Sequence, residues 1–242
     1  MKMSFSPLVR GSMSAFCLTV ATAAGAASLQ VAPVSVEVAA PGATATMSLR
    51  NLGTVPLDAQ IRVFRWTEVD GAEKLVPTDE VVASPPAMSI PANSEYTVRI
   101  VRTTKEPVSG EEAYRLFVDE LPDASRNTGA SVNLVLRYSI PVFFTPAGGA
   151  GAKLAWDVQR RDGRTYVVAT NNGDRRVRIS RLKIGSPKGT IASFGDGLVG
   201  YVLAHSTVQW VSPRSSRPPA VEALITADSD LGPISAQIRS TR

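Results

Sequence analysis

The chain of 242 residues contains one histidine and one cysteine, so the residues on which most metal centres and nucleophilic sites depend are nearly absent. Cys17 lies in the N-terminal segment, and His205 stands in a short turn-like stretch between two alternating runs. This inventory excludes His/Cys metal sites and Cys/His nucleophile pairs. Asp119 and Glu120 are neighbours, so on a strand their carboxylates point to opposite faces and cannot act as an acid–base pair. We therefore expect no enzyme, no metal and no cofactor.

Long apolar runs, helical periodicity and strong charge are also missing. Aromatic residues make up 6% of the chain and its formal net charge is only +5, with no basic run interleaved with aromatics, so nucleic acid is not an expected partner. No useful window shows apolar residues at a 3.6-residue spacing, so helices should be few. Beyond the N-terminus no segment is apolar over the ~20 residues that span a bilayer, so we expect no stable membrane insertion.

Residues 1–26 have the features of a cleavable export signal. The start is basic, the stretch that follows is uncharged, and Ala24-Gly25-Ala26 fits the small-x-small cleavage rule. Cys17 lies inside this segment, and the bulky residue before it argues against lipidation. The alternative is a retained membrane anchor, but the segment is rich in Ala and Ser and shorter than a membrane span. The mature chain is then exported, begins at Ala27 or Ser28, and has no disulfide.

Short runs of alternating apolar and polar residues recur along the mature chain. Such runs, separated by Gly, Pro and Asn, are typical of antiparallel β-sandwiches, so we predict an all-β fold. In the first half the expected strands are Leu29 to Val38, Ala45 to Leu49, Ala59 to Trp66, Tyr96 to Val101, Tyr114 to Leu121 and Val132 to Phe144. In the second half they are Lys153 to Arg160, Thr165 to Thr170, Arg176 to Ile184, Val199 to Leu203, Thr207 to Val211, Ala220 to Thr226 and Ile234 to Ile238.

A small and flexible stretch, residues 147–152, divides these strands into two groups. We expect an N-terminal domain at 27–146 and a C-terminal domain at 153–242; the alternative is one continuous β domain with a glycine-rich loop. Arg161-Asp162-Gly163 predicts a hairpin, because Asp-Gly suits the positive φ angles of a type I′ turn. Residues 77–89, which contain two adjacent prolines, are expected to form a loop or an edge segment.

The last run of the first domain, residues 132–144, is the most informative. Its alternation predicts a strand with one strongly apolar face. Pro141 cannot donate a ladder hydrogen bond, so the strand should lie at a sheet edge or be bulged there. An apolar edge strand promotes aggregation unless another chain pairs with it. The pattern therefore favours a strand that is offered to a partner, although the row could instead face the protein's own core.

Several stretches, spread in order over almost the whole mature chain, together carry a family pattern. They are Val31 to Val36, Ala59 to Trp66, Val82 to Pro86, Tyr96 to Arg102, Ala113 to Pro122, Leu136 to Phe144, Ala169 to Gly173 and Gly200 to Ala204. Together they resemble the PapD-like family of periplasmic pilus-assembly chaperones, in particular its archaic branch, associated with Csu-type and spore-coat-U-type pili. The resemblance implies two immunoglobulin-like sandwiches in a boomerang, a periplasmic location, and chaperoning without nucleotide.

Members of this family lay the last strand of their N-terminal domain into the groove of a pilin subunit that lacks a strand, and later release the subunit to a neighbour or to an outer-membrane usher. By resemblance, the apolar run described above is this donor strand. Val132, Leu134 and Leu136 match the side chains that fill the subunit groove. Tyr138 and Ile140 continue the row. The implied partners are pilin or spore-coat-U-like subunits and an usher, and the exposed row would also allow self-association of the free form.

Well-studied members hold the subunit's C-terminal carboxylate with an arginine on the first strand and a lysine on the last. Here Ser35 and Pro141 stand at these two places, so another base must bind a carboxylate. The candidates are arginines on nearby strands of the first domain. They are Arg115 and Arg137 first, because their strands should be neighbours, and then Arg102 and Arg99. Each could instead be a solvated strand arginine or, for the last two, part of an interdomain salt bridge.

Two other protein classes are compatible with parts of this pattern. A two-domain sandwich exported as a structural or adhesive module would have the same strands but would stay in the final fibre. An exported sandwich-fold hydrolase would need catalytic groups that this composition hardly supplies. The sequence therefore predicts an ATP-independent chaperone that stabilises pilus or coat subunits by donating a strand and delivers them to an usher.

Overall fold

The computed structural model describes residues 28–122, 135–186, 189–212 and 222–239, and within them the chain forms eighteen strands and no helix. The first ten are β1 (Leu29–Ala32), β2 (Val36–Ala39), β3 (Thr44–Asn51), β4 (Leu57–Val69), β5 (Ala72–Pro77), β6 (Val81–Ser84), β7 (Ala87–Ile90), β8 (Glu95–Arg102), β9 (Glu112–Glu120) and β10 (Arg137–Thr145). The others are β11 (Leu154–Arg161), β12 (Arg164–Asn171), β13 (Val177–Ser186), β14 (Gly189–Ser193), β15 (Leu198–Val202), β16 (Thr207–Val211), β17 (Glu222–Ser229) and β18 (Gly232–Arg239). Over the same residues, no helix able to cross a membrane is found.

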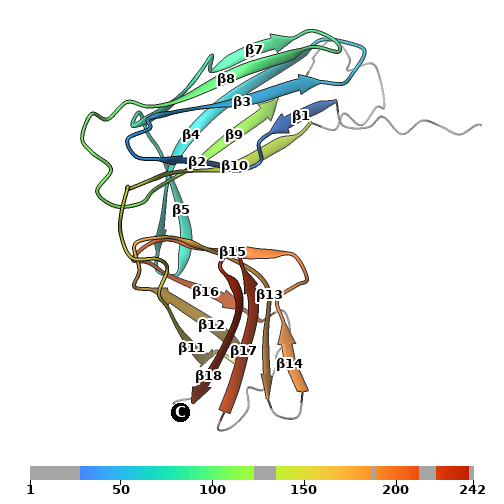
Figure 1. Ribbon diagram of the computed structural model, residues 1–242. Helices are drawn as coiled ribbons and strands as arrows, with labels where there is room; N and C mark the ends of the chain where they lie inside the picture. Colours follow the sequence, from blue (N-terminus) through green and yellow to red (C-terminus); the bar gives the residue numbers. More distant parts are fainter. Residues whose placement is uncertain (1–27, 123–134, 187–188, 213–221, 240–242) are drawn as a thin grey trace, which may run out of the picture.

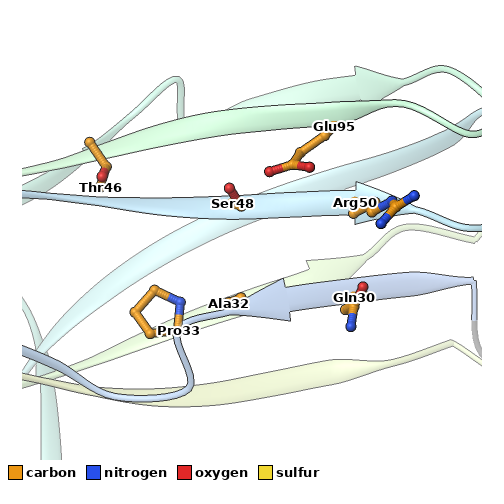
Figure 2. Close-up of a pocket in the computed structure, with 7 residues that line it drawn as sticks. All are labelled: Gln30, Ala32, Pro33, Thr46, Ser48, Arg50 and Glu95. Carbon is orange, nitrogen blue, oxygen red and sulfur yellow. The ribbon is translucent and has the colours of Figure 1, made fainter.

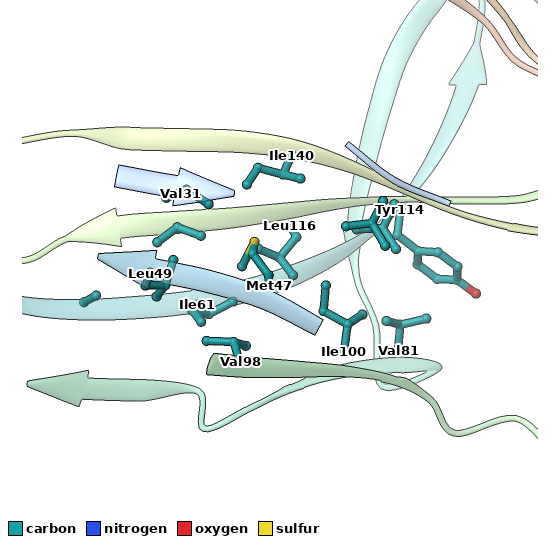
Figure 3. Close-up of a cluster of buried hydrophobic side chains, with 14 of the residues drawn as sticks. Val31, Met47, Leu49, Ile61, Val81, Val98, Ile100, Tyr114, Leu116 and Ile140 are labelled. Atoms are coloured by element: carbon teal, nitrogen blue, oxygen red, sulfur yellow. The ribbon is translucent and has the colours of Figure 1, made fainter. Parts of the chain in front are cut away.

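The first ten strands form a sandwich of two sheets around one core (Figure 1). One sheet has the order β1-β3-β8-β6, and the other has the order β2-β10-β9-β4-β5, with β7 beside β4. β2 and β10 pair in parallel, with Val36 opposite Val142, whereas the neighbouring β9 and β10 are antiparallel. Leu49, Ile100 and Leu116 are fully buried between the sheets (Figure 3), and burying each such side chain contributes about 1.5–3 kcal/mol.

The remaining strands form a second sandwich with its own core. Its sheets have the orders β11-β12-β16 and β14-β13-β17-β18, and β15 pairs with β13. β11 and β12 form the predicted hairpin, in which Asp162 and Gly163 have φ angles of 51° and 75°. β10 ends at Thr145 and β11 begins at Leu154, so the glycine-rich stretch connects the two sandwiches. The prediction of an all-β fold is confirmed.

The same buried turn recurs in both sandwiches at an Asn-x-Gly sequence. Asn51 donates from Nδ2 to the carbonyl oxygen four residues later (2.7 Å), and its Oδ1 accepts the N–H of Gly53 (2.8 Å). Asn171 makes the same two bonds, at 2.7 Å and, to Gly173, at 2.9 Å. Both amides also donate to carbonyls of segments more than 30 residues away. Because both asparagines are fully buried, each fixes its turn to a neighbouring segment.

Most predicted strands are present, and the differences have local reasons. The run from Leu29 to Val38 forms two strands, β1 and β2, which belong to different sheets. Residues 77–89 contain β6 and most of β7, and both fit the expected edge segment: β6 lies at the edge of its sheet, and β7 pairs, among the described residues, with one strand only, β4. β5 and β14 were not predicted, because most of their side chains are exposed and their apolar residues do not alternate.

Candidate partner-binding edge and interdomain cleft

β10 carries the second part of the predicted donor strand, whereas Val132 and Leu134 lie outside the described residues. Leu136 is half-buried just before β10. Tyr138 is half-buried against the core of the first domain, and its hydroxyl donates to a backbone carbonyl of β1. Ile140 is 2% exposed and lies within that core (Figure 3). For Ile140 the structure corrects the expectation: in this conformation the side chain packs on the protein's own core and is not available to a partner.

One edge of β10 is open along its first half. β9 pairs with β10 from Arg137 to Phe144, whereas β2 covers the other edge only from Val142 onward. Among the described residues, no strand pairs with that edge between Arg137 and Pro141. Pro141 stands where β2 begins, so the expected edge position holds for the first half of β10, although β2 is the outermost strand. We call the free position beside residues 137–141 the open lane.

Aromatic side chains of both domains meet where the two sandwiches contact each other, a region that we call the cleft. Trp66 of β4 and Phe143 of β10 lie outside the core of the first domain, and Tyr201 of β15 contacts both, with ring centroids 5.4 and 5.9 Å apart. Leu203 completes the cluster. Trp66 is 3% exposed and Phe143 is fully buried, so this contact forms a small core of its own.

Ion pairs also join the two domains. Arg176, just before β13, contacts Glu111 at 2.7 Å and Glu37 at 2.6 Å, and its guanidinium lies 3.5 Å from the ring centroid of Phe143. The side chains of Arg176 and Glu111 are 11% and 1% exposed. A pair this deeply buried makes each charge depend on the other, because removing one leaves its partner uncompensated. Arg176 therefore fixes the second domain to two segments of the first.

The β4–β5 hairpin reaches from the first domain to the second (Figure 1). At its tip, the carbonyl of Gly71 accepts the N–H of Gln209 at 3.0 Å. Glu68, on the same hairpin, accepts the N–H of Leu203 at 3.1 Å and the hydroxyl of Ser206. Burial outweighs these bonds and raises the pKa of Glu68 to about 7. The interdomain contact therefore contains a carboxyl group that titrates near neutral pH.

Two of the four candidate arginines are poorly placed to bind a carboxylate in the cleft. Arg99 is exposed on β8, which belongs to the sheet that does not contain β10. Arg102 is 8% exposed, and its Nε and Nη2 bind the two oxygens of Glu112 at 2.8 and 2.7 Å. Its Nη1 donates to the carbonyls of Thr104 and Glu106, both at 2.7 Å. Arg102 is thus committed to contacts within its own domain.

Arg137 is the first residue of β10 and lies beside the open lane. Its Nε donates to Asp119, which also accepts Nη2 of Arg62 at 2.7 Å. Burial opposes ionisation of Asp119, but the hydrogen bonds from the two arginines outweigh it and lower the pKa of this carboxyl group. The three residues form a charged cluster along the first half of β10, at the end away from the cleft.

Arg115 is the candidate that faces the cleft. It lies opposite Pro141 in the pairing of β9 with β10. Arg115 is therefore one strand away from Pro141 and two strands away from Ser35, the two places that the resemblance assigns to a basic pair. Its guanidinium lies 3.7 Å from the ring centroid of Trp66. Its Nε and Nη2 donate to one oxygen of Glu73 on β5, at 3.1 and 2.9 Å.

Sequence reasoning missed the charged residues that join the domains. Arg176 was assigned only as the start of a strand, and the fold alone brings it to Glu111. The sequence does contain a signal for the hairpin, the Asp-Gly dipeptide at 70–71. A turn at this position places Glu68 directly opposite Glu73, as the structure shows. That signal predicts the pair of glutamates but not their partners in the cleft.

Other surfaces of the described residues carry few groups that could bind a metal ion or a ligand. No group of three or more His, Cys, Asp or Glu side chains in these segments could hold a metal ion. A shallow trough on the β1-β3-β8-β6 sheet (Figure 2) is lined by small and polar side chains, with Arg50 and Glu95 near one end. The open lane and the cleft are therefore the candidate site.

Comparisons with known proteins identify the family of this chain and its fold. The family model for the N-terminal domain of PapD, a pili and flagellar-assembly chaperone, matches residues 28–150. A chain of the CsuC–CsuE chaperone–tip adhesion subunit pre-assembly complex, from the archaic chaperone-usher Csu pili of Acinetobacter baumannii, is 26% identical with a TM-score of 0.70, covering 89% of this chain and 100% of that chain. No curated protein matched the chain.

Two further structures share the fold over both sandwiches. The YadV chaperone is 20% identical with a TM-score of 0.61, over 88% of this chain and 100% of that chain. A chain of the Salmonella enterica SafA pilin–SafB chaperone complex is 19% identical with a TM-score of 0.60, over 87% and 96%. The predicted pair of immunoglobulin-like sandwiches is thereby confirmed. Because the family model covers just over half of the sequence, the chain belongs to the PapD-like family of pili and flagellar-assembly chaperones.

Proposed function

We propose that the protein is an ATP-independent periplasmic chaperone that binds pilus or coat subunits by donating β10 and delivers them to an outer-membrane usher. The observation that carries this proposal is the open lane, where the edge of β10 has no partner strand among the described residues. A free edge next to an apolar row binds an extended segment through main-chain hydrogen bonds and side-chain pockets. The likeness to a chain from archaic Csu pili supports the archaic branch.

The side chains that we propose are donated come from the residues just before β10. Leu136 is the one within the described residues, and Val132 and Leu134 precede it in the same alternating row. Tyr138 lies between the side chains proposed to enter the subunit and those that pack in the protein's own core, because it is half-buried against that core. Each leucine that enters a subunit groove contributes about 1.5–3 kcal/mol. Three such side chains with the main-chain bonds of the open lane would give a firm complex.

We further infer that Arg115 receives the C-terminal carboxylate of the bound segment. A strand in the open lane must stop at Pro141, where β2 takes over the edge. Neighbouring strands lie about 4.7–4.9 Å apart, so the lane is about 9–10 Å from β9, which carries Arg115. An extended arginine side chain and one hydrogen bond of about 2.9 Å cover such a distance.

The N-terminal segment bears on where in the cell the protein acts. The family is periplasmic, and we infer that residues 1–26, which lie outside the described residues, are the cleaved export signal. The free edge also permits a second copy of the chaperone to occupy the lane before a subunit arrives. An exported structural or adhesive module has the same fold class, but the comparisons do not favour it, since they match chaperones.

Purification of the tagged mature chain from its own periplasm tests the proposal. We expect small exported β-rich proteins to co-elute in a one-to-one ratio, as mass spectrometry would show. Leu136→Asp should abolish this capture, because a carboxylate cannot enter an apolar groove unpaired. Val135→Asp is the matched control, since Val135 is 44% exposed and stands next to Leu136, outside the predicted apolar row. Equal recovery with both variants, when the subunits are expressed, would contradict strand donation.

A further inference from the structure

Arg115 already binds a carboxylate in the free protein. Its Nε and Nη2 both donate to Oε2 of Glu73, at 3.1 and 2.9 Å. The arginine side chain is 15% exposed, whereas that of Glu73 is 43% exposed. The cation is thus built into the cleft, and its anion is a peripheral side chain that water reaches.

The aromatic residues of the cleft hold the guanidinium in place. Trp66 lies 3.7 Å below it and Tyr201 lies 5.7 Å away, measured to the ring centroids. Stacking on an aromatic face fixes the plane of the guanidinium and leaves its N–H edge free for a carboxylate. A second carboxylate could therefore use the same donors that Glu73 now occupies.

Glu73 itself is weakly held. It lies directly opposite Glu68 across the β4–β5 hairpin, so two carboxyl groups share one face of the sheet. Like charges directly opposite each other on a sheet destabilise the pair, and the charge of Glu73 contributes to the raised pKa of Glu68. An ion pair with an exposed partner contributes only about 0–1 kcal/mol. Release of Glu73 into solvent is therefore inexpensive.

The sheet order makes the two positions mutually exclusive. Arg115 is on β9, with β4 and β5 on one side and β10 and the open lane on the other. Glu73 is two strands away in one direction, and the lane is two strands away in the other. Each is about 9–10 Å from the β9 backbone, so one guanidinium cannot contact both. A carboxylate that ends a strand in the lane must draw Arg115 away from Glu73.

We propose that Glu73 is an internal competitor, which occupies Arg115 in the free chaperone and is displaced by the terminal carboxylate of a captured strand. This inference rests on the proposed function, in which Arg115 receives that carboxylate. Glu73 then sets a threshold: a segment with a free C-terminal carboxylate in the right register displaces it, whereas an internal segment gains nothing from Arg115.

The test uses two short synthetic peptides of alternating valine and threonine, one ending in a free carboxylate and the other in a carboxamide. Binding to the mature protein is measured by calorimetry. Glu73→Gln should tighten the carboxylate peptide by about two- to fivefold, because the competing ion pair is removed. The same variant should leave the carboxamide peptide unchanged. Glu95→Gln, which removes an equal charge from the other sheet (Figure 2), should change neither.

Arg115→Ala distinguishes the role of Arg115 as the carboxylate anchor from the role of Glu73 as its competitor. If it weakens the carboxylate peptide while Glu73→Gln has no effect, Glu73 is not a competitor and the Arg115 anchor stands. If neither variant changes the affinity for the carboxylate peptide, the anchor is wrong and the competitor fails with it. Lack of binding by both peptides to every variant would overturn the open lane as a binding position, and with it this inference.

Discussion

The carboxyl group of Glu68 should make the stability of the domain contact depend on pH, and Glu68→Gln tests this. In the folded protein burial raises its pKa from 4.5 to about 7. Between these two values the folded state holds a proton that the unfolded state has lost. The contribution of Glu68 is therefore fully favourable below pH 4.5 and is lost as the pH rises through 7. This sign is opposite to that of a salt-bridged carboxylate.

The size of the effect follows from the shift in pKa. Each unit of pKa corresponds to about 1.4 kcal/mol, so a rise from 4.5 to about 7 sets an upper bound of about 3–4 kcal/mol. Glu68 is only partly buried, and solvent screening reduces the expected loss to about 1–2 kcal/mol between pH 5 and 8. Glutamine keeps an oxygen that can accept the N–H of Leu203 and the hydroxyl of Ser206, but it does not ionise.

Urea unfolding of the wild type and of Glu68→Gln, repeated from pH 5 to pH 8, measures this difference. We expect equal free energies of unfolding near pH 5, and a variant more stable by about 1–2 kcal/mol near pH 8. Asp119, Glu112 and Asp174 do not confuse the result, because their pKa values are lowered and they titrate below this range. A difference between the two proteins that stays constant with pH would refute the assignment of the proton to Glu68.

Three further changes have defined outcomes. Asn171→Ala should lower the free energy of unfolding by about 2–3 kcal/mol, measured with urea, since it leaves buried backbone groups unpaired. Arg176→Met should cost about 3–5 kcal/mol by leaving the carboxylate of Glu111 buried without its partner, and calorimetry should then resolve two unfolding transitions. Glu73→Gln should shift the pH profile of Glu68 to lower values in the urea series, because the charge opposite it is gone.

The strands could be predicted because alternation with a period of two reports which side of a sheet is buried. Residues 72–77 escaped this reasoning, since an exposed hairpin has no apolar face to reveal it. The row that includes Leu136 and Ile140 shows a second limit. Because the two residues are an even number of positions apart, alternation places both side chains on one face of a strand. Only the fold shows which residues of that face pack on the protein's own core. Ile140, at the C-terminal end of the predicted row, therefore packs on the protein's own core, and donation of the rest of the row stays a prediction.

The arginines show why the site was harder to predict than the fold. All four candidates lie on strands of the first domain, and the expected strand order ranks Arg115 and Arg137 first but does not separate these two. Their hydrogen-bond partners in the structure distinguish these arginines. Arg102 is surrounded by acceptors of its own domain, whereas Arg115 contacts a carboxylate near the end of a hairpin. These partners are ten and 42 residues away along the chain. Electrostatic roles of this kind depend on tertiary contacts and not on local residue order.

An open strand edge exposes a protein to self-pairing, and the structure indicates how this chaperone limits it. The open lane is short, since β2 closes the edge from Val142 onward. Its start is flanked by the charges of Arg62, Asp119 and Arg137, which a second copy in the lane would have to face. Charged side chains and short free edges are the means by which sheets resist edge-to-edge association. Under the proposed strand donation, a subunit would differ from a second copy because it would offer an apolar groove for Leu136. The side chain that would distinguish a subunit from a second copy therefore lies next to the charges that oppose self-pairing.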